Sequence, residues 1–328
     1  MSRLVVLKGL VAAHYRPHGL HAESQVWPEK NCYVDIWIEL LHTLGLEPRA
    51  VMAFTLAVDF EGDQWTFFKP PHGEIHALYG IDVQELNVWR PLLDHAVEHL
   101  AAGRLLSTES DAFWLPDTAG TDYRRQHTKT TIVLNDLDLE AQALGYFHNA
   151  GYHRLEGEDF RRLFRIGVDP DPGFLPLYAE LIRSDRVVRR RADALGSIAL
   201  DLLREHGARR PASNPMPRFG ERLGQELPTL PAQGLPHYHA WAFATVRQFG
   251  AAFELAAAHL RWHAGLGRAD LLPAAECFDR IAQGGKALIL KLARTVNTGR
   301  PADLAPLLGD MASAWDDGMA ALDRALGA

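Results

Sequence analysis

The second half of the chain carries the pattern that most limits its possible folds, because apolar residues recur there every three or four positions over long stretches. This spacing is typical of amphipathic helices that bury one face. We expect four such helices, at Leu175 to His206, His237 to Ala264, Pro273 to Asn297 and Asp303 to Leu326. The segment Pro211 to Pro217 between the first two contains three prolines and is not expected to continue a helix. The pattern predicts a bundle of about four helices.

The first half changes character often, which predicts a mixed α/β unit. The expected helices are Cys32 to Leu44, Ile75 to Tyr79 and Arg90 to Ala102. The expected strands are Val51 to Phe60, Trp65 to Phe68, Arg104 to Thr108 and Ala112 to Leu115, followed by a hairpin of Thr128 to Leu134 and Ala143 to Phe147 with a turn at Asn135 to Glu140. The segment Asp169 to Gly173 is rich in proline and is typical of a domain boundary. We therefore predict an α+β protein, with an α/β domain over residues 1–170 and an all-α helical bundle domain over residues 171–328.

Charge and cysteine content exclude several classes of partner. A formal charge of -7 and a pI near 6.1 give no general attraction to nucleic acid or to an anionic membrane. The apolar stretch from Leu4 to Ala13 is interrupted by Lys8 and is too short to span a bilayer. Two cysteines in 328 residues do not make a disulfide framework. We expect a cytoplasmic protein that binds neither nucleic acid nor membrane.

Cys32 stands at the expected start of the first helix, seven residues after Gln25. Unpaired backbone N–H groups and the helix dipole at an N-terminus stabilise a thiolate and make the sulfur more nucleophilic. The side-chain amide of Gln25 could donate to an oxyanion that forms beside this sulfur. The alternative is that Cys32 is a small buried core residue. The first interpretation predicts thiol-based acyl chemistry.

A cysteine nucleophile needs a base, and the base needs a group that orients it. If the hairpin turn is centred near residue 138, Asn149 lies directly opposite His127 and shares its face of the sheet. The carbonyl oxygen of Asn149 would then accept from His127 and hold its ring towards Cys32. The predicted catalytic set is Cys32, His127, Asn149 and Gln25. Surface or turn positions are the alternative for the last three.

Asp111, Asp117 and Asp122 crowd the segment just before His127. Their carboxylates could bind the ammonium group of an aminoacyl substrate, with a solvated loop as the alternative. The cluster His14, His18 and His21 does not predict a metal site, because Pro17 and Gly19 interrupt any helix that would align it. The glycine-rich motifs of nucleotide-binding proteins are missing from the sequence, so no cofactor is expected.

Glutamine, then cysteine at a helix start, then histidine and asparagine on later strands is the order found in papain-like cysteine enzymes, which residues 20 to 165 resemble. The stretches Asn31 to Asp35, Asp117 to Tyr123 and Gly145 to Tyr152 look like an uncharacterised bacterial family of unknown function that accompanies carrier proteins and amino acid:carrier-protein ligases. The two-part layout is similar to that of the butirosin-biosynthesis acyltransferase.

The resemblance implies a papain-like domain followed by a helical bundle. It also implies a cysteine-dependent acyltransferase that passes an acyl or aminoacyl group from a carrier-protein thioester, through Cys32, to a small-molecule amine acceptor. His127 would be the base, and Asp136 or Asp138 is the alternative to Asn149 as its orienting group. A hydrolase with the same residues (a peptidase, amidase or thioesterase) and a noncatalytic carrier-protein-binding protein remain the alternative functions.

Overall fold

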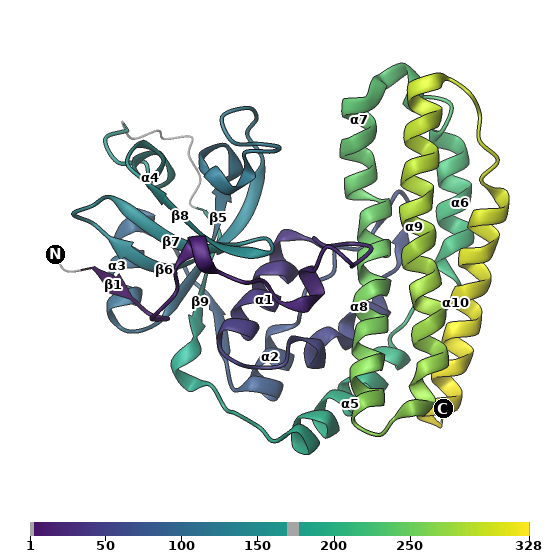
Figure 1. Cartoon of the computed structure of the whole chain (residues 1–328), viewed down its shortest axis with the longest axis horizontal. Helices are drawn as coiled ribbons and strands as arrows, with labels where there is room; N and C mark the ends of the chain where they lie inside the picture. The colour runs from purple at the N-terminus through teal and green to yellow at the C-terminus, as the bar shows by residue number, and fades with distance from the viewer. Residues whose placement is uncertain (1–2, 169–176, 328) are drawn as a thin grey trace. The chain divides into compact units, whose positions relative to one another are not determined.

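The computed structural model describes residues 3–168 and 177–327, and the chain forms two compact units (Figure 1). The first unit combines Met1–Ala22, Cys32–Leu46 and Ile75–Arg189. The second combines Glu23–Asn31, Glu47–Glu74 and Arg190–Ala328. Each unit is therefore assembled from separate parts of the chain. The domain boundary predicted near residue 170 lies outside the described residues.

The first unit is built on a seven-stranded antiparallel sheet with the strand order β4-β9-β5-β6-β7-β8, to which β1 adds by pairing with β6. Its strands are β1 (Leu4–Val5), β4 (Asp82–Glu85), β5 (Leu105–Asp111), β6 (Lys129–Asp138), β7 (Ala143–His148), β8 (Gly151–Glu156) and β9 (Ala179–Arg183). Its α-helices are α1 (Cys32–Thr43), α3 (Leu92–Ala101) and α4 (Glu158–Leu163). Its short 3₁₀ helices are η1 (Ala12–His14), η2 (Gly19–His21), η4 (Ala112–Trp114), η5 (Pro116–Thr118) and η6 (Ser184–Arg186). The helix α2 (His72–Tyr79) contains the point in the chain where the second unit ends and the first unit resumes.

Alternation along the strands divides the sheet into two faces, because successive side chains of a strand point in opposite directions. Leu106, Leu134 and Tyr146 belong to an apolar cluster that includes residues of α3 and α4. Val133 and Phe147, at the intervening positions, point to the other face, against which α1 packs. The sheet is thus covered on both faces, which explains why every residue of β7 is buried.

The helix α1 is buried over most of its length, including two acidic residues. His21 lies between them, with its Nε2 3.0 Å from an oxygen of Asp35 and its Nδ1 in contact with Glu39. Tyr15 donates its hydroxyl to Glu39 at 2.6 Å, and the backbone N–H of His18 donates to the same carboxylate at 2.9 Å. Buried carboxylates are costly unless they are paired, so this network ties the η1–η2 segment to α1.

The second unit is mainly helical. Its elements are η3 (Pro48–Ala57), the hairpin β2 (Phe60–Glu61) and β3 (Gln64–Trp65), α5 (Ala192–Ala208), α6 (Pro215–Glu226), α7 (Leu230–Ala244), α8 (Val246–Gly265), η7 (Ala269–Leu271), α9 (Leu272–Thr298) and α10 (Ala305–Leu326). The long helix α9 packs between α8 and α10 (Figure 1). The helix α7 is kinked at Gly234, two residues before Pro236. Gly234 has a φ of 80°, a value that glycine adopts without steric cost, and Pro236 has no N–H to continue the helical hydrogen bonds.

A short N-terminal segment, residues 23–31, packs on α8 and α9 within the second unit. The carboxylate of Glu254 accepts from the backbone N–H groups of Val26 at 2.7 Å and Trp27 at 3.2 Å, and pairs with Lys30 at 3.3 Å. The indole N–H of Trp27 donates to the carbonyl oxygen of Ala282 at 3.0 Å. The buried carboxylate of Glu254 therefore holds residues 23–31 in place, although they lie more than two hundred residues earlier in the chain.

Several predicted elements are confirmed. The helix expected from Cys32 is α1, and the helices expected from Ile75 and Arg90 are α2 and α3. The last two long helices are α9 and α10, within one or two residues of their expected bounds. The predicted hairpin is formed by β6 and β7. The clearest signals are the regular apolar spacing of α9 and α10 and the run of β-branched residues from Thr130 to Val133 in β6.

Other predicted elements are wrong. The expected strand Val51–Phe60 is mostly the 3₁₀ helix η3, because an apolar run that is buried on all sides has no periodicity to separate strand from helix. Likewise the expected strand Ala112–Leu115 is the 3₁₀ turn η4, whose first turn is capped by Asp111.

The first and second expected long helices are each divided. Residues 175–176 lie outside the described residues, and the part of the first that is described contains β9 and η6 before α5 begins at Ala192. The second consists of the kinked α7 followed by α8. The proline segment also contains the start of α6, a helix that the sequence did not predict. Pro215 lies in the first turn of α6, where the backbone N–H groups have no partner within the helix, so the missing N–H of proline removes no hydrogen bond.

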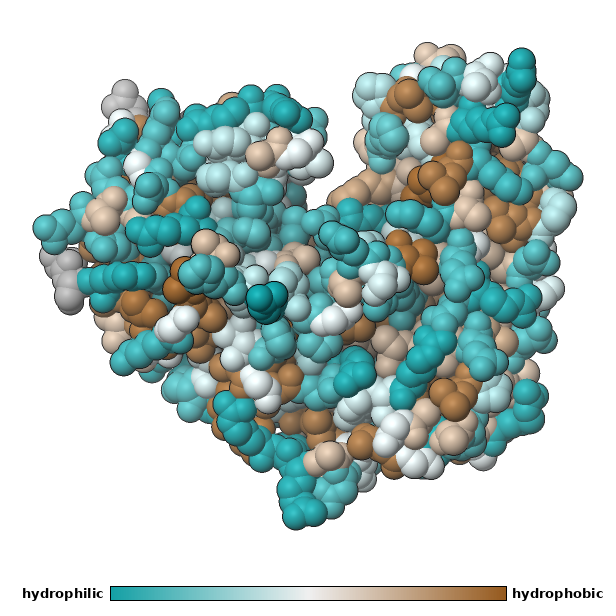
Figure 2. All heavy atoms as spheres, viewed as in Figure 1, coloured by the Kyte–Doolittle hydropathy of each residue, from teal (hydrophilic) through white to brown (hydrophobic). Residues whose placement is uncertain are grey.

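The surface carries mixed polarity. On the face drawn in Figure 2, hydrophilic residues are spread over both units and hydrophobic residues lie among them in small groups. Exposed large apolar side chains include Trp89 in the first unit and Phe243 and Leu290 in the second. In the part of the chain that the structure describes, no helix combines the length and apolar character required to cross a membrane.

Candidate functional site

Cys32 is the first residue of α1, and its side chain is half-buried. The adjacent Tyr33 is buried and donates its hydroxyl to Glu180 of β9 at 2.8 Å. Glu180 pairs with Ser107 of β5, which pairs in turn with Val133 of β6. The start of α1 is therefore anchored over the middle of the sheet. The predicted helix-start position of Cys32 is confirmed, and the residue is partly exposed.

His127 lies in the loop before β6, with 68% of its side chain exposed. Its Nδ1 is 2.5 Å from Oδ2 of Asp111, and its ring stacks on Phe113 with 4.4 Å between the ring centroids. The other oxygen of Asp111 accepts from the backbone N–H of Phe113 at 3.0 Å. Asp111 is thus held at both oxygens and orients the imidazole. Among the hydrogen bonds of the described residues, none joins His127 to Cys32.

The predicted pairing of Asn149 with His127 is wrong. In the structure, Val133 of β6 pairs with Phe147 of β7. If this register is continued, the residue opposite Asn149 is residue 131 and not residue 127. The reason is that β6 continues to Asp138 through the segment expected to be a turn, so the turn comes later in the chain. Asn149 itself occupies the tight turn between β7 and β8 and has a φ of 44°.

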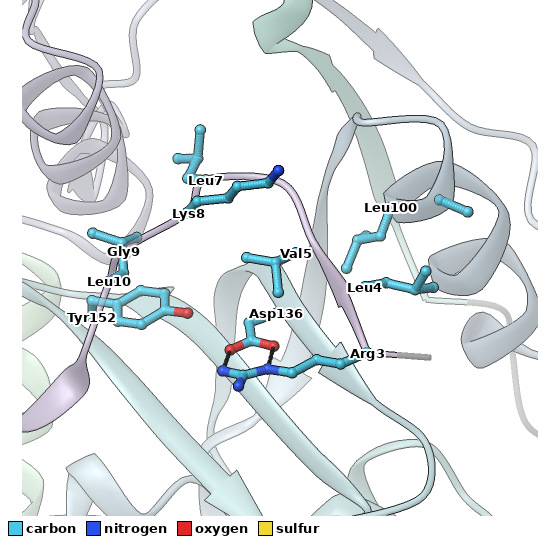
Figure 3. A pocket seen from close by; sticks show the side chains of 11 residues that line it. Arg3, Leu4, Val5, Leu7, Lys8, Gly9, Leu10, Leu100, Asp136 and Tyr152 are labelled. Atoms are coloured by element: carbon cyan, nitrogen blue, oxygen red, sulfur yellow. Dashed lines mark hydrogen bonds and ion pairs between the residues drawn. The ribbon is translucent and has the colours of Figure 1, made fainter. Parts of the chain in front are cut away.

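The two alternative orienting groups bind other partners. The carboxylate of Asp136 forms an ion pair with the guanidinium of Arg3, with 2.6 Å between Nε of Arg3 and Oδ1 of Asp136 (Figure 3). Asp138 accepts from two backbone N–H groups of the following turn, at 3.1 and 2.9 Å. The carboxylate that binds His127 is therefore Asp111, which the sequence had suggested only as a substrate ligand.

Gln25, the predicted oxyanion donor, belongs to the segment Glu23–Asn31 of the second unit, whereas Cys32 begins the next part of the first unit. The two residues are close in the chain but fall in different compact units. A role of Gln25 in stabilising an oxyanion stays a prediction.

Asp117 lies in a buried network that the sequence did not predict. Its Oδ2 is 2.5 Å from Nδ1 of His148, and its Oδ1 accepts from the hydroxyl of Tyr146. Burial alone would raise the pKa of Asp117, but the hydrogen bond and charge of His148 outweigh it and keep the pKa below its ordinary value. The signal that could have found this network is the spacing of Tyr146 and His148, which places both side chains on one face of β7.

The third aspartate, Asp122, is more exposed and accepts from Thr128 at 2.6 Å and from Gln126 at 2.8 Å. Its limited burial favours a higher pKa, yet the hydrogen bonds from Thr121 and Thr128 lower the pKa below its ordinary value. Asp122 thus stabilises the turn that leads into β6 and remains ionised at neutral pH.

A cavity of about 510 Å³ lies in the first unit where β1 pairs with β6 (Figure 3). Arg3 and Lys8 lie on either side of Val5 there, and Tyr152 closes another side. Of the residues that the structure describes, neither Cys32 nor His127 lines this cavity. In residues 3–168 and 177–327, the histidine, cysteine and acidic side chains form no group of three placed to hold a metal ion.

Comparison with known proteins gives a family and no named relative. Two family models match, the DUF1839 N-terminal domain over residues 16–184 and the DUF1839 C-terminal domain over residues 192–324. No curated protein matches the chain. Since the two models together span most of its length, the chain belongs to the DUF1839 family, whose N-terminal and C-terminal domains are both present.

Proposed function

We propose that this protein is a cysteine-dependent acyltransferase, in which Cys32 takes an acyl or aminoacyl group from a carrier-protein thioester and passes it to an amine. The observation that carries the proposal is the half-buried cysteine at the first residue of α1, in a unit that combines one buried helix with an antiparallel sheet. The thiolate is the reactive form of a cysteine. The sheet-and-helix arrangement supports the proposed likeness to papain-like enzymes.

The proposed base is His127, oriented by Asp111 rather than by Asn149. A carboxylate bonded to Nδ1 selects the tautomer whose Nε2 can accept a proton, as the third member of a catalytic triad does. The stacking of the ring on Phe113 restricts its rotation further. In the proposed reaction, Nε2 of His127 takes the proton of the Cys32 thiol before or during attack on the acyl group.

The chemistry then proceeds in two steps. The Cys32 sulfur attacks the thioester carbonyl, and the carrier thiol leaves with the proton returned by His127. An amine next attacks the acyl-enzyme, loses its proton to His127 and releases the Cys32 thiol. A thioester donor is already activated, so the transfer needs no nucleotide. If water replaces the amine, the same residues make a hydrolase.

The test uses acetyl N-acetylcysteamine, a small thioester that represents the carrier arm. We expect mass spectrometry of the intact protein to show one acetyl group, located on the peptide that contains Cys32. Cys32→Ala should carry none. His127→Gln and Asp111→Asn should form the adduct about 100-fold more slowly, which is the usual contribution of a general base.

The matched control is the second cysteine, Cys277, which lies in α9 of the second unit. Burial raises the pKa of this thiol, so a smaller fraction is thiolate at neutral pH. Cys277→Ala should therefore acetylate as fast as wild type. Equal labelling of wild type and Cys32→Ala would reject the nucleophile. Unchanged rates in His127→Gln would reject the base. Decay of the adduct at a rate independent of added amines would identify a hydrolase.

A further inference from the structure

We propose that the first unit contains a second nucleophilic centre, formed by Asp117, His148 and Thr130 with Ser110 beside it, which accepts the acyl group of a small activated ester. This centre is independent of Cys32. It lies on the sheet face that carries the cluster of Leu134 and Tyr146, whereas α1 packs on the other face.

The hydrogen bonds of His148 have the connectivity of a catalytic triad. Its Nδ1 is 2.5 Å from Oδ2 of Asp117, and its Nε2 is 2.7 Å from Oγ1 of Thr130. An ionised Asp117 can only accept, so a ring proton lies on Nδ1, and the tautomer that carries only this proton can accept the Thr130 hydroxyl proton at Nε2. A hydroxyl, an imidazole and a carboxylate joined in this order are recognised as a triad by geometry, whatever their order in the chain.

The triad is assembled from three separate elements and is largely buried. Asp117 comes from η5, Thr130 from the start of β6 and His148 from the end of β7. The side chain of His148 is 1% exposed and that of Asp117 is 8% exposed. A base held by packing on a rigid sheet is pre-organised, and low exposure strengthens its hydrogen bonds.

Ser110 supplies the observation that points to a missing ligand. It pairs directly with Thr130 across β5 and β6, so the two side chains lie on the same face of the sheet. Ser110 is 7% exposed, and its buried hydroxyl has no hydrogen-bond partner among residues 3–168 and 177–327. A buried hydroxyl left unpaired destabilises the fold, and a bound acyl group would offer it an acceptor.

Backbone strain accompanies this centre. Asn149, next to His148 in the chain, has a φ of 44°, and Arg124 in the segment that carries Asp117 has a φ of 57°. Residues other than glycine rarely adopt such values, and the strain concentrates where the surrounding structure must hold a side chain in one place.

The proposed reaction is balanced with water as the only co-reactant. The Thr130 oxygen attacks the acyl carbon while its proton passes to Nε2 of His148. The bond to the leaving alcohol or thiol breaks, and that group leaves with the proton. Water then attacks the acyl-threonine ester, gives its proton to His148, and releases a carboxylic acid and the original hydroxyl.

The experiment uses full-length protein carrying Cys32→Ala, so that the thiol proposed above contributes nothing and the two proposals fail or succeed separately. This protein is incubated with 4-nitrophenyl acetate, and the acetylated peptide is located by mass spectrometry. We expect the acetyl group on Thr130. Adding Thr130→Val should abolish it, and adding His148→Gln should slow its formation about 100-fold or more.

The matched control is Thr131→Val, which removes a hydroxyl from the next position of β6, on the opposite face of the sheet. It should acetylate as fast as the Cys32→Ala parent, and thermal unfolding should show that each variant is folded. Because the parent protein alone maps the modified residue, a variant that does not fold leaves the test intact. An unmodified Thr130, acetylation of Ser110 instead, or a rate unchanged by His148→Gln would each overturn the proposal.

Discussion

Lys30→Met is expected to lower the free energy of unfolding by about 3–5 kcal/mol, because it removes one partner of a buried ion pair and leaves the other charge uncompensated. The side chain of Lys30 is 0% exposed and that of Glu254 is 7% exposed, with 3.3 Å between the charged atoms. The ammonium group also donates to the carbonyl oxygen of Trp27. The substitution therefore disturbs the contact between residues 23–31 and α8.

Urea denaturation measures this effect, and hydrogen exchange in α8 locates it. The double variant Lys30→Met with Glu254→Gln should recover about 1–2 kcal/mol, since it removes the unpaired charge and keeps one oxygen that accepts from the backbone N–H of Val26. The control Arg191→Met breaks an exposed ion pair with Asp193 and should change the free energy by less than about 0.5 kcal/mol. A loss for Lys30→Met as small as that of the control would show that the buried pair contributes little.

His21→Leu is expected to have a similarly large effect in the first unit, about 3–5 kcal/mol. The side chains of His21, Asp35 and Glu39 are all 0% exposed, and the imidazole contacts both carboxylates. Without it, two negative charges remain buried near each other on α1, while Tyr15 and the backbone N–H of His18 still donate to Glu39. We expect faster hydrogen exchange at the amides of α1.

The same network predicts how stability depends on pH. Burial by itself would lower the pKa of His21, but the hydrogen bonds that its ring donates to Asp35 and Glu39, together with the charges of these carboxylates, outweigh burial and raise the pKa above 6.5. A group whose folded-state pKa is raised stabilises the fold fully below its unfolded pKa, near 6.5, and this contribution is lost as pH rises through the folded-state value. The free energy of unfolding should therefore fall on the alkaline side of pH 6.5.

Urea denaturation of wild type and His21→Gln from pH 5.5 to pH 9 tests the sign. The wild type should lose stability over this interval, and His21→Gln should show a flatter dependence. His14→Gln removes an exposed histidine of the same unit and should keep the wild-type slope. A slope that disappears in His14→Gln, or that persists unchanged in His21→Gln, would contradict the assignment.

The parts of the fold that could be predicted are those whose structure depends on residues close together in the sequence. The helices α9 and α10 follow from a repeat of apolar residues within a single segment, and Gly299 and Gly327 end them with left-handed backbone. Where every residue of a segment is apolar, as in η3, the periodic signal is absent and the prediction of a strand was wrong. Pro215 misled for a different reason, because proline opposes a helix interior but suits a helix start.

The candidate site divides in the same way. The place of Cys32 at the start of α1 was readable from the sequence, since it depends only on neighbouring residues. The partner of His127 was not, because the choice of Asp111 depends on the register between β5 and β6. The predicted register failed because β6 runs further than expected and shifts near residue 135. One irregularity of this kind changes every cross-strand pair beyond it.

The sequence by itself determined the α+β composition, the helical character of the second half and the helix-start cysteine. Only the tertiary structure decided that residues 23–31 and 47–74 pack with the C-terminal helices, and that Asp117, Thr130 and His148 meet. The physical reason is the range of the interactions. Helical periodicity reflects contacts between residues three or four apart, whereas a buried carboxylate such as Glu254 selects its partners from the whole folded chain.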